Sequence, residues 1–287
     1  MSKDVPLVHK LVHRESKDYI LRVMRDAGFK VASLLQISRS TFYITFVRDD
    51  GEMNVKIDIN AIEQSSMLYW WEKVKNLPIP KPRTIIVPFK DPGKDFQRLK
   101  EAARKIGYPI FLRTDHTSGK HYFYKTCYVP SEDELVYHVN ELLEFSDMAG
   151  IIGLPVNAFV VREYIELDWR FRAFLGLPIA PEYRFLVRDG KVERYFPYWP
   201  KSAIKFFRDD GPSNWEMLLE QMYEETKGDI PLLSKYALLV AKAVEGFWSV
   251  DFAKARDGTW YLIDMARGEV SWTPEMTKED RANAEKE

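Results

Sequence analysis

Val250-Asp251-Phe252 is followed by Asp257-Gly258 and then by Trp260-Tyr261-Leu262-Ile263-Asp264 in the last third of this 287-residue chain. The runs at 247–252 and 259–265 are rich in aromatic and β-branched side chains, which favour strands. Asp-Gly between two such runs is a strong local signal for a tight turn. We therefore expect an antiparallel β-hairpin that carries its two carboxylates on one face.

The two carboxylates, Asp251 and Asp264, each lie inside an apolar run. An ionised carboxylate is costly there unless a cation or a hydrogen-bond donor compensates it. Two of them side by side indicate a divalent metal, and Mg²⁺ suits hard oxygen ligands and completes its shell with water and substrate phosphates. The alternative is two solvated strand residues, one of them bonded to Arg256 or Arg267. The hairpin alone leaves both interpretations open.

The composition is that of an ordinary globular protein, with 46% hydrophobic and 30% charged residues, long enough for one large domain or two modest ones. Lys and Arg total 42 against 43 for Asp and Glu, which argues against nucleic acid or an acidic membrane surface as a partner. The sequence has neither a signal-peptide core nor a membrane-spanning run of ~20 apolar residues, so we expect a cytoplasmic protein. The single cysteine, Cys127, lies in a strand-like run, and we expect a buried structural thiol rather than a nucleophile.

The Pro-rich run Leu77-Pro78-Ile79-Pro80-Lys81-Pro82 ends a helix, because proline cannot continue one, and we place a domain boundary there. The predicted helices cover 17–28, 61–75, 94–106, 131–145, 213–226 and 231–246, and the predicted strands outside the C-terminal hairpin cover 42–47, 55–59, 84–87, 109–113, 159–165 and 182–187.

A polar run, Thr114-Asp115-His116-Thr117-Ser118-Gly119-Lys120-His121, follows the strand predicted at 109–113. Small hydroxyl residues, glycine and lysine in a mobile loop can wrap phosphates through backbone N–H groups and a point charge. A simple hairpin loop with solvated polar residues is the alternative.

This order of segments resembles the ATP-grasp superfamily over residues 77–274, and within it the arginine-to-lysine (R-to-K) clade, in which an arginine replaces the first ATP-binding lysine. The last third also resembles the eukaryotic ATP-grasp chaperones that help to assemble a translation initiation factor. The motifs that carry the resemblance are Arg113-Thr114-Asp115, Val161-Arg162-Glu163-Tyr164-Ile165, Glu182-Tyr183-Arg184-Phe185 with Asp189-Gly190-Lys191, Tyr198-Trp199-Pro200 and Gly268-Glu269-Val270-Ser271.

The resemblance implies an α+β ATP-grasp fold, in which two α/β lobes with antiparallel sheets clasp ATP. A small N-terminal α/β unit would cover residues 1–76, the small lobe 77–162 and the large lobe 163–275. The charged tail, 276–287, would be a frayed helix or disordered.

The same resemblance implies a nucleotide site. Glu163, Tyr164 and Ile165 match the hinge, where the family's backbone groups read the adenine edge and an apolar side chain packs on the ring. Arg113 would contact the α- and β-phosphates, because its planar fork suits phosphate oxygens.

Two lysines are candidates for the remaining phosphate charge. Lys125 is favoured, because it sits on the strand predicted to follow the loop and would have a fixed direction. Lys120 lies on the loop itself and would close over ATP.

Asp251 and Asp264 match the family's metal ligands, although the second is more often a glutamate. The usual asparagine two residues further on is Ala266 here, which leaves open whether one or two Mg²⁺ ions bind. Glu269 could substitute through a water molecule.

Arg184 and Arg162 are the candidates for stabilising charge on an acyl-phosphate transition state, where preorganised cations matter most. Glu182 is expected to orient Arg184. A purely structural ion pair between Glu182 and Arg184 is the alternative.

The resemblance implies an ATP-dependent ligase that uses ATP and Mg²⁺ to join a carboxylate to an amine through an acyl-phosphate. The carboxylate and the amine are unidentified, and a peptide or protein is a candidate substrate. Residues 166–181 and 195–212 would border the acceptor site. An ATP- and Mg²⁺-binding assembly chaperone or interaction protein without turnover is the second hypothesis. A third, action on nucleic acid, has only scattered residues such as Tyr195, Trp199 and Arg208 behind it.

Overall fold

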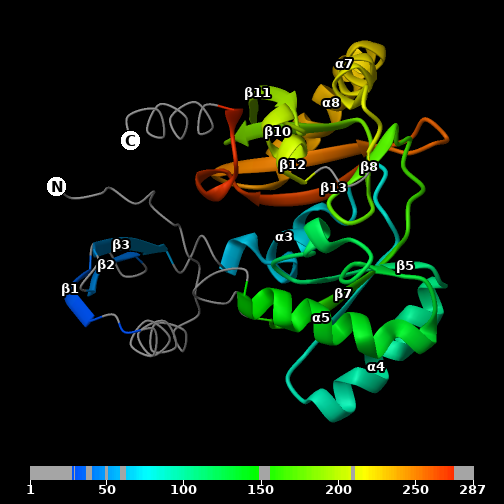
Figure 1. The fold of residues 1–287 in the computed structure, drawn as a ribbon. Helices are drawn as coiled ribbons and strands as arrows, with labels where there is room; N and C mark the ends of the chain where they lie inside the picture. The colour runs from blue at the N-terminus through cyan, green and yellow to red at the C-terminus, as the bar shows by residue number, and fades with distance from the viewer. Residues whose placement is uncertain are drawn as a thin grey trace. The chain divides into compact units, whose positions relative to one another are not determined.

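The structure is a computed structural model that describes residues 28, 30–36, 41–48, 51–58, 63–148, 156–207 and 211–274. The tail at 276–287 lies outside the described residues, as does the predicted helix at 17–28 apart from Gly28. The described residues up to Glu72 form one compact unit with Pro82–Ile165, and Lys73–Lys81 form a second with those from Glu166 onward. The fold is α+β, and every sheet in the described part of the chain is antiparallel (Figure 1).

The N-terminal sheet has the strand order β1-β2-β3, with β1 at Lys30–Gln36, β2 at Thr41–Arg48 and β3 at Gly51–Asp58. The pairing of β2 with β3 confirms the predicted hairpin at 42–47 and 55–59, whereas β1 was not predicted. Ile44 and Phe46 alternate on β2 and are both fully buried, so one face of this strand is a core face.

The helix predicted at 61–75 is interrupted. Residues 63–65 are helical, Ser66 breaks the helix, and α3 then covers Met67–Val74. The backbone N–H of Met67 donates to the Asp115 carbonyl at 2.8 Å, so this N–H at the start of α3 has a partner outside the helix.

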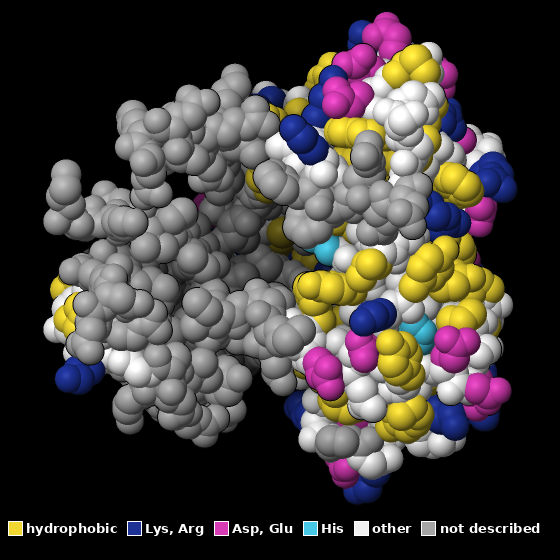
Figure 2. Space-filling view, in the orientation of Figure 1, with side chains coloured by type: hydrophobic (Ala, Val, Ile, Leu, Met, Phe, Trp, Pro, Cys, Tyr) yellow, Lys and Arg dark blue, Asp and Glu magenta, His cyan; other side chains and the backbone are white. Residues whose placement is uncertain are grey.

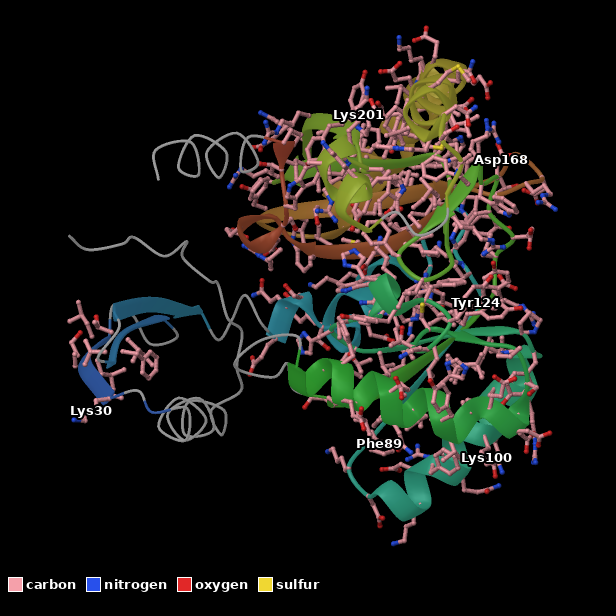
Figure 3. The ribbon with its side chains drawn as sticks, in the orientation of Figure 1. Lys30, Phe89, Lys100, Tyr124, Asp168 and Lys201 are labelled. Atoms are coloured by element: carbon pink, nitrogen blue, oxygen red, sulfur yellow. The ribbon has the colours of Figure 1, made fainter. Side chains whose placement is uncertain are left out.

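A four-stranded sheet, here called the β5–β7 sheet, has the order β4-β7-β5-β6. Helices α4 and α5 cover one face, and the core between them includes Leu112, Val161, Leu99 and Leu142. Near the start of β7, the ring of Phe89 (labelled in Figure 3) packs edge-on against the ring of Phe159, at 4.8 Å between centroids. The elements are β4 at Thr84–Pro88, α4 at Pro92–Ile106, β5 at Ile110–Thr114, β6 at Tyr128–Val129, α5 at Leu135–Met148 and β7 at Ala158–Glu163.

The other face of the β5–β7 sheet carries arginines. Arg113 is paired with Val160, and Arg162 with Phe111, so the two arginines are diagonal neighbours on adjacent strands. Leu112 and Val161 point to the helix-covered face, and residues one position along a strand point to the opposite face. The register therefore gathers Arg113 and Arg162 on the face away from α4 and α5.

The second unit contains the β10–β12 sheet, of order β11-β10-β12-β13. Helices α7 and α8 pack on one face, where the Tyr183 hydroxyl lies 3.2 Å from the Thr226 hydroxyl and Phe252 contacts Tyr236. A short hairpin of β8 at Phe171–Ala173 and β9 at Leu177–Ile179, which was not predicted, precedes it. The remaining elements are β10 at Glu182–Arg188, β11 at Lys191–Pro197, α6 at Lys201–Phe207, α7 at Trp215–Thr226, α8 at Ile230–Ala243, β12 at Phe247–Lys254 and β13 at Trp260–Arg267.

The predicted C-terminal hairpin is confirmed, and a β-bulge decides which side chains share its face. Lys254 pairs with Trp260 and Phe252 with Leu262, but Asp251 pairs with Asp264. An unbroken register would have placed Ile263 opposite Asp251 and turned Asp264 to the helix-covered face. The extra residue, Ile263, brings the two carboxylates onto the same face.

Candidate functional site

A row of charged side chains crosses the β10–β12 sheet on the face away from α7 and α8. Asp251 on β12 lies opposite Arg184 on β10 and opposite Asp264 on β13. The Arg184 guanidinium donates from Nε to Asp251 Oδ1 at 2.7 Å and from Nη2 to Oδ2 at 2.6 Å. This is a bidentate pair between two buried side chains, with 10% and 3% of their surfaces exposed.

The environment of Arg184 keeps it charged. Burial opposes the charge, but the Asp251 carboxylate outweighs burial and raises the pKa of the guanidinium above its ordinary value. Two further contacts hold the group: Nη1 donates to the Trp272 carbonyl at 3.1 Å, and the guanidinium carbon lies 4.7 Å from the centre of the Tyr198 ring. Arg184 is therefore a fixed, permanently charged group.

The alternative of two solvated carboxylates is wrong for Asp251, which is buried and bonded to Arg184. Arg256 pairs with Glu166 instead, at 3.3 Å. Asp264 is half-buried, and its Oδ1 accepts a hydrogen bond from the N–H of Met265 at 3.0 Å. Asp251 orients the Arg184 guanidinium through two hydrogen bonds. Glu182, which the sequence predicts to orient Arg184, is buried two residues before it on the same face of β10.

The oxygen donors at this row suit one Mg²⁺ ion rather than two. Asp251 and Asp264 are directly opposed on neighbouring strands and offer the hard oxygens that Mg²⁺ prefers, provided that Asp251 exchanges its bonds to Arg184. For a second ion, Ala266 offers no side-chain donor and Glu269 is held by Arg267 at 2.8 and 3.1 Å. Within the described ranges, no three His, Cys, Asp or Glu side chains gather as a metal-binding group.

In the first unit, Arg113 and Arg162 are each 3% exposed. Arg113 Nε donates to the Thr114 carbonyl at 3.1 Å, and Arg162 Nε donates to the Thr84 hydroxyl at 3.3 Å. These contacts help to fix the direction of the two guanidinium groups. Two cations on one face of a sheet are suited to an anion that carries several negative oxygens.

The hinge candidates follow at the end of β7. The Glu163 carboxylate accepts hydrogen bonds from the N–H and the Nε of Arg83 at 2.8 and 2.6 Å, so its side chain stabilises the edge of the sheet. The Tyr164 ring packs edge-on against Tyr128 at 5.0 Å, and Ile165 is half-buried. Aromatic and apolar side chains therefore gather at this end of the strand.

The two lysine candidates lie in different settings from those predicted. Lys125 is not on a strand: residues 123–127 form turns, its N–H donates to the Tyr122 carbonyl at 2.8 Å, and β6 begins only at Tyr128. These turns directly follow a short 3₁₀ helix, Lys120–Tyr122. Lys120 opens that helix and is half-buried, whereas Lys125 is exposed.

The loop after β5 is held by hydrogen bonds at several points. The N–H groups of His116 and Thr117 both donate to the Thr114 hydroxyl, at 3.3 and 2.9 Å, so these amides already have partners. Sequence reasoning missed the anchor of the loop, Asp115, which is fully buried. Its carboxylate accepts hydrogen bonds from the hydroxyl of Ser66 at 2.7 Å, the N–H of Asn157 at 3.0 Å and the N–H of Ala158 at 3.2 Å.

The profile of the ATP-grasp domain, arginine-to-lysine clade family 3, matches residues 102–284, which is more than half of the chain. This protein belongs to the ATP-grasp superfamily, in family 3 of the arginine-to-lysine clade. The expected α+β ATP-grasp fold and the predicted clade are thereby confirmed.

Three solved structures to which this ATP-grasp protein is similar have low sequence identity to it. Cdc123 from Schizosaccharomyces pombe has 14% identity and a TM-score of 0.46, over 76% of this chain and 92% of that one. A RimK domain ATP-grasp protein from Sphaerobacter thermophilus has 14% identity and a TM-score of 0.39, over 78% and 65%. D-alanine–D-alanine ligase from Bacillus anthracis, complexed with ATP, has 13% identity and a TM-score of 0.39, over 76% and 59%.

The ATP-grasp chain thus spans less than two thirds of the two bacterial chains. No curated protein matches its sequence.

The described helices include none with the length and apolar character needed to cross a membrane. Acidic and basic side chains are interspersed over the described surface on the face shown in Figure 2, in line with the formal net charge of −1.

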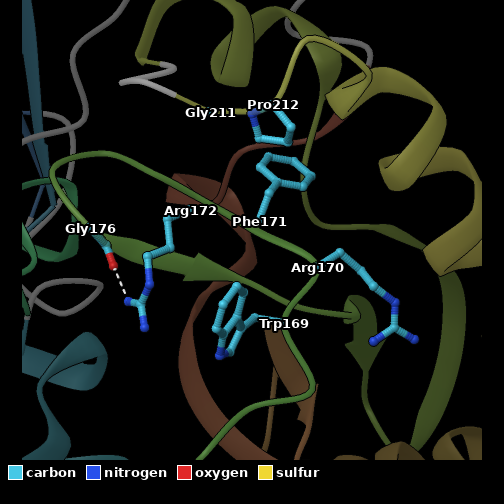
Figure 4. Close-up of a pocket in the computed structure, with 7 residues that line it drawn as sticks. All are labelled: Trp169, Arg170, Phe171, Arg172, Gly176, Gly211 and Pro212. Atoms are coloured by element: carbon cyan, nitrogen blue, oxygen red, sulfur yellow. Dashed lines mark hydrogen bonds between the residues drawn. The ribbon is translucent and has the colours of Figure 1, made fainter.

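A cavity of about 410 Å³ lies within the second unit of the ATP-grasp protein. In Figure 4, Phe171 lies beside Pro212, and Arg172 reaches toward Gly176 with Trp169 nearby. Arg172 Nη1 donates to the Gly176 carbonyl at 2.7 Å, and its guanidinium carbon lies 4.8 Å from the centre of the Trp169 ring. The cavity falls within the two ranges, 166–181 and 195–212, that the sequence placed around the acceptor site.

Cys127 is a structural thiol, as expected. It is fully buried, and burial raises the pKa of the thiol to about 12. Since only the thiolate is a good nucleophile, we expect no reaction with a disulfide reagent such as DTNB at pH 8 in the folded protein, and complete reaction of one thiol per chain in guanidinium. Rapid labelling of the folded protein would show that this part of the first unit opens.

Gly119 holds the end of the loop in a conformation that favours glycine. Its φ is +59°, and a β-carbon there would lie 3.0 Å from the Phe145 ring and 3.1 Å from the Thr126 methyl. We expect Gly119→Ala to lower the free energy of unfolding by about 1–3 kcal/mol, measured by chemical denaturation. Gly190→Ala is the matched control, because its φ is +80° and nothing lies within 4 Å of the added carbon. An equal loss of stability in the two variants would show that the contacts of the added carbon with Phe145 and Thr126 do not matter.

Proposed function

We propose that this ATP-grasp protein is an ATP-dependent ligase that joins a carboxylate to an amine through an acyl-phosphate. The observation that carries the proposal is the row Arg184, Asp251 and Asp264, which sets a fixed cation beside two oxygen donors. Phosphoryl transfer needs both: positive charge on the transferring group and a metal-binding carboxylate. Membership of the ATP-grasp superfamily supports ATP as the phosphoryl donor.

The proposed reaction has two steps. An oxygen of the substrate carboxylate attacks the γ-phosphorus of ATP, the bond from that phosphorus to the bridging oxygen breaks, and ADP leaves. The amine nitrogen then attacks the acyl carbon, inorganic phosphate leaves with the electron pair of the carbon–oxygen bond, and the nitrogen releases a proton to solvent. In both steps negative charge builds on phosphate oxygens, which arginine side chains stabilise bidentately.

The residues divide between the parts of this proposal. Arg113 would contact the α- and β-phosphates, and Arg184 and Arg162 the transferring phosphoryl group, with Glu182 near Arg184. One Mg²⁺ ion held by Asp251 and Asp264 would supply Lewis-acid stabilisation of phosphate oxygens. The backbone and side chains of Glu163, Tyr164 and Ile165 would hold adenine, and Lys120 and Lys125 would supply further phosphate charge.

The amine that accepts the acyl group would bind in the cavity around Trp169 and Phe171. Its aromatic walls suit an apolar or aromatic group, and Arg172 suits a carboxylate next to it. Amino acids and peptides with an aromatic side chain combine these features with the amine that the reaction needs. We propose this class as the acceptor.

A second function is favoured by three features of the candidate metal-binding residues. Asp251 is held by Arg184 and Glu269 by Arg267, and Ala266 stands where the family has an asparagine. A site with fewer metal-binding oxygens would bind ATP without efficient turnover, as in the chaperones that the last third resembles. In that case ATP would order the chain for a protein partner.

The two functions differ in ADP release. ATP binding is measured by calorimetry in Mg²⁺, and ADP release is then followed with a panel of carboxylates crossed with amines, aromatic amino acids and peptides included. The ligase proposal expects release that requires both a carboxylate and an amine. ATP binding without release for any pair would favour the binding protein.

A further inference from the structure

The Arg184 guanidinium is held by two independent sets of partners. One edge, Nε and Nη2, bonds to the Asp251 carboxylate at 2.7 and 2.6 Å. The remaining nitrogen, Nη1, donates to the main-chain carbonyl of Trp272 at 3.1 Å, and the Tyr198 ring lies beside the guanidinium. The edge that faces Asp251 is the one with the geometry to grip two phosphate oxygens.

The Trp272 carbonyl owes its position to the segment that follows β13, residues 268–272, which we call the positioning arm. The arm begins at Gly268, where a β-carbon would overlap the Phe247 ring, so its first residue is seated directly on that ring. The Ser271 hydroxyl lies 2.7 Å from the Ser249 hydroxyl on β12 and donates to the Arg267 carbonyl at 2.9 Å. Both serines are buried, with 6% and 0% exposed.

The far end of the arm is fixed by an aromatic contact. The Trp272 ring packs edge-on against Phe196 on β11, at 5.7 Å between centroids. Phe196 pairs with Arg184 across the sheet, so the arm is anchored on both sides of the guanidinium, at β11 and at β12. A carbonyl held at both sides is a rigid acceptor for Nη1.

We infer that Ser249, Ser271 and Trp272 are positioning residues for phosphate binding, because they hold Arg184 in place when Asp251 turns to a cation. The inference rests on the proposed function, in which Asp251 is a metal ligand. Without the arm, a guanidinium released by Asp251 would lose its strongest partner and its direction together. With the arm, the Nε and Nη2 edge stays presented to phosphate oxygens.

A double-mutant cycle on ATP binding tests this inference. The variants are Ser271→Ala, Arg184→Lys and the two combined, with the dissociation constant of ATP measured by calorimetry in Mg²⁺ and thermal unfolding followed on the same samples. We expect Ser271→Ala to weaken ATP binding roughly three- to tenfold. The substitution would loosen the hydrogen bond from Arg184 Nη1 to the Trp272 carbonyl, and a single hydrogen bond changes an equilibrium constant by about that factor. In the Arg184→Lys background, which lacks the planar fork, Ser271→Ala should weaken binding no further.

A merely structural serine would give another pattern. It would lower thermal stability and weaken ATP binding equally in both backgrounds, and that result overturns the inference. Ser249→Ala removes the other hydroxyl of the same contact and is expected to give the same result as Ser271→Ala. It therefore tests the inference even if the Ser271 variant folds poorly. Ser146→Ala is the control, because it removes a buried hydroxyl on α5 that donates to the Leu142 carbonyl within the same helix.

ATP binding by the wild type distinguishes a failure of the proposed function from a failure of the inference alone. If it does not bind ATP, the proposed function fails and the inference fails with it. If it binds ATP and both serine variants bind equally well, the inference alone is wrong.

Discussion

Replacing Asp251 by alanine is expected to lower the free energy of unfolding by about 3–5 kcal/mol, the usual cost of leaving one member of a buried ion pair without its partner. Arg184 would keep its charge and its contacts to the Trp272 carbonyl and the Tyr198 ring, but it would lose the carboxylate that holds its Nε and Nη2 edge. Two charge-assisted hydrogen bonds, at 2.7 and 2.6 Å, would be lost together. Chemical denaturation in urea measures the change.

The same strand provides a matched control. Arg188 on β10 pairs with Glu193 at 2.6 Å, but 46% and 40% of these two side chains are exposed. Glu193→Ala should therefore cost at most about 1 kcal/mol. Combining Asp251→Leu with Arg184→Met should recover much of the lost stability, since apolar residues of similar volume often replace a buried pair without loss. A destabilisation by Asp251→Ala no larger than that of Glu193→Ala would contradict the buried pair.

Replacing Arg113 by methionine is expected to weaken ATP binding roughly 10- to 100-fold, as the loss of hydrogen bonds to a charged partner predicts. Arg113 is 3% exposed, so water screens its interaction with a phosphate only weakly. Arg113→Lys should fall between wild type and methionine, because lysine keeps the charge but not the planar fork. Calorimetric titration of ATP measures the three proteins.

The control for this second series is Arg98→Met on α4. Arg98 pairs with Asp95 at 3.1 Å and 60% of its side chain is exposed, so its loss should leave ATP binding unchanged. Thermal unfolding must be measured for each variant, since Arg113 is buried. Unchanged ATP affinity in a well-folded Arg113→Met protein would remove this arginine from the phosphate site.

The C-terminal hairpin could be predicted because its signals are local. Two β-branched and aromatic runs and one Asp-Gly turn fix an antiparallel pair, and the structure pairs them as expected. The shared face of Asp251 and Asp264 depends on more than that, because it needs the bulge at Ile263. Without the bulge, the observed register that pairs Lys254 with Trp260 would have placed the two carboxylates on opposite faces.

The partner of Asp251 could not be predicted, because it comes from a strand 67 residues earlier in the chain. Which residues of β10 and β12 face each other is set by the packing of the whole sheet. The same holds for Asp115, whose partners Ser66 and Asn157 are 49 and 42 residues away. The prediction that Lys125 lies on a strand was wrong for a local reason, because its β-like neighbours form turns after a 3₁₀ helix.

The most direct test of the central claim is a calorimetric titration of ATP and Mg²⁺ into the wild type and into an Asp251→Asn, Asp264→Asn double variant. We expect ATP binding that requires the metal in the wild type and is lost in a folded double variant. Metal-dependent ATP binding of equal strength in both proteins, or none in the wild type, would contradict the account and leave the row of charges on the β10–β12 sheet as a structural feature.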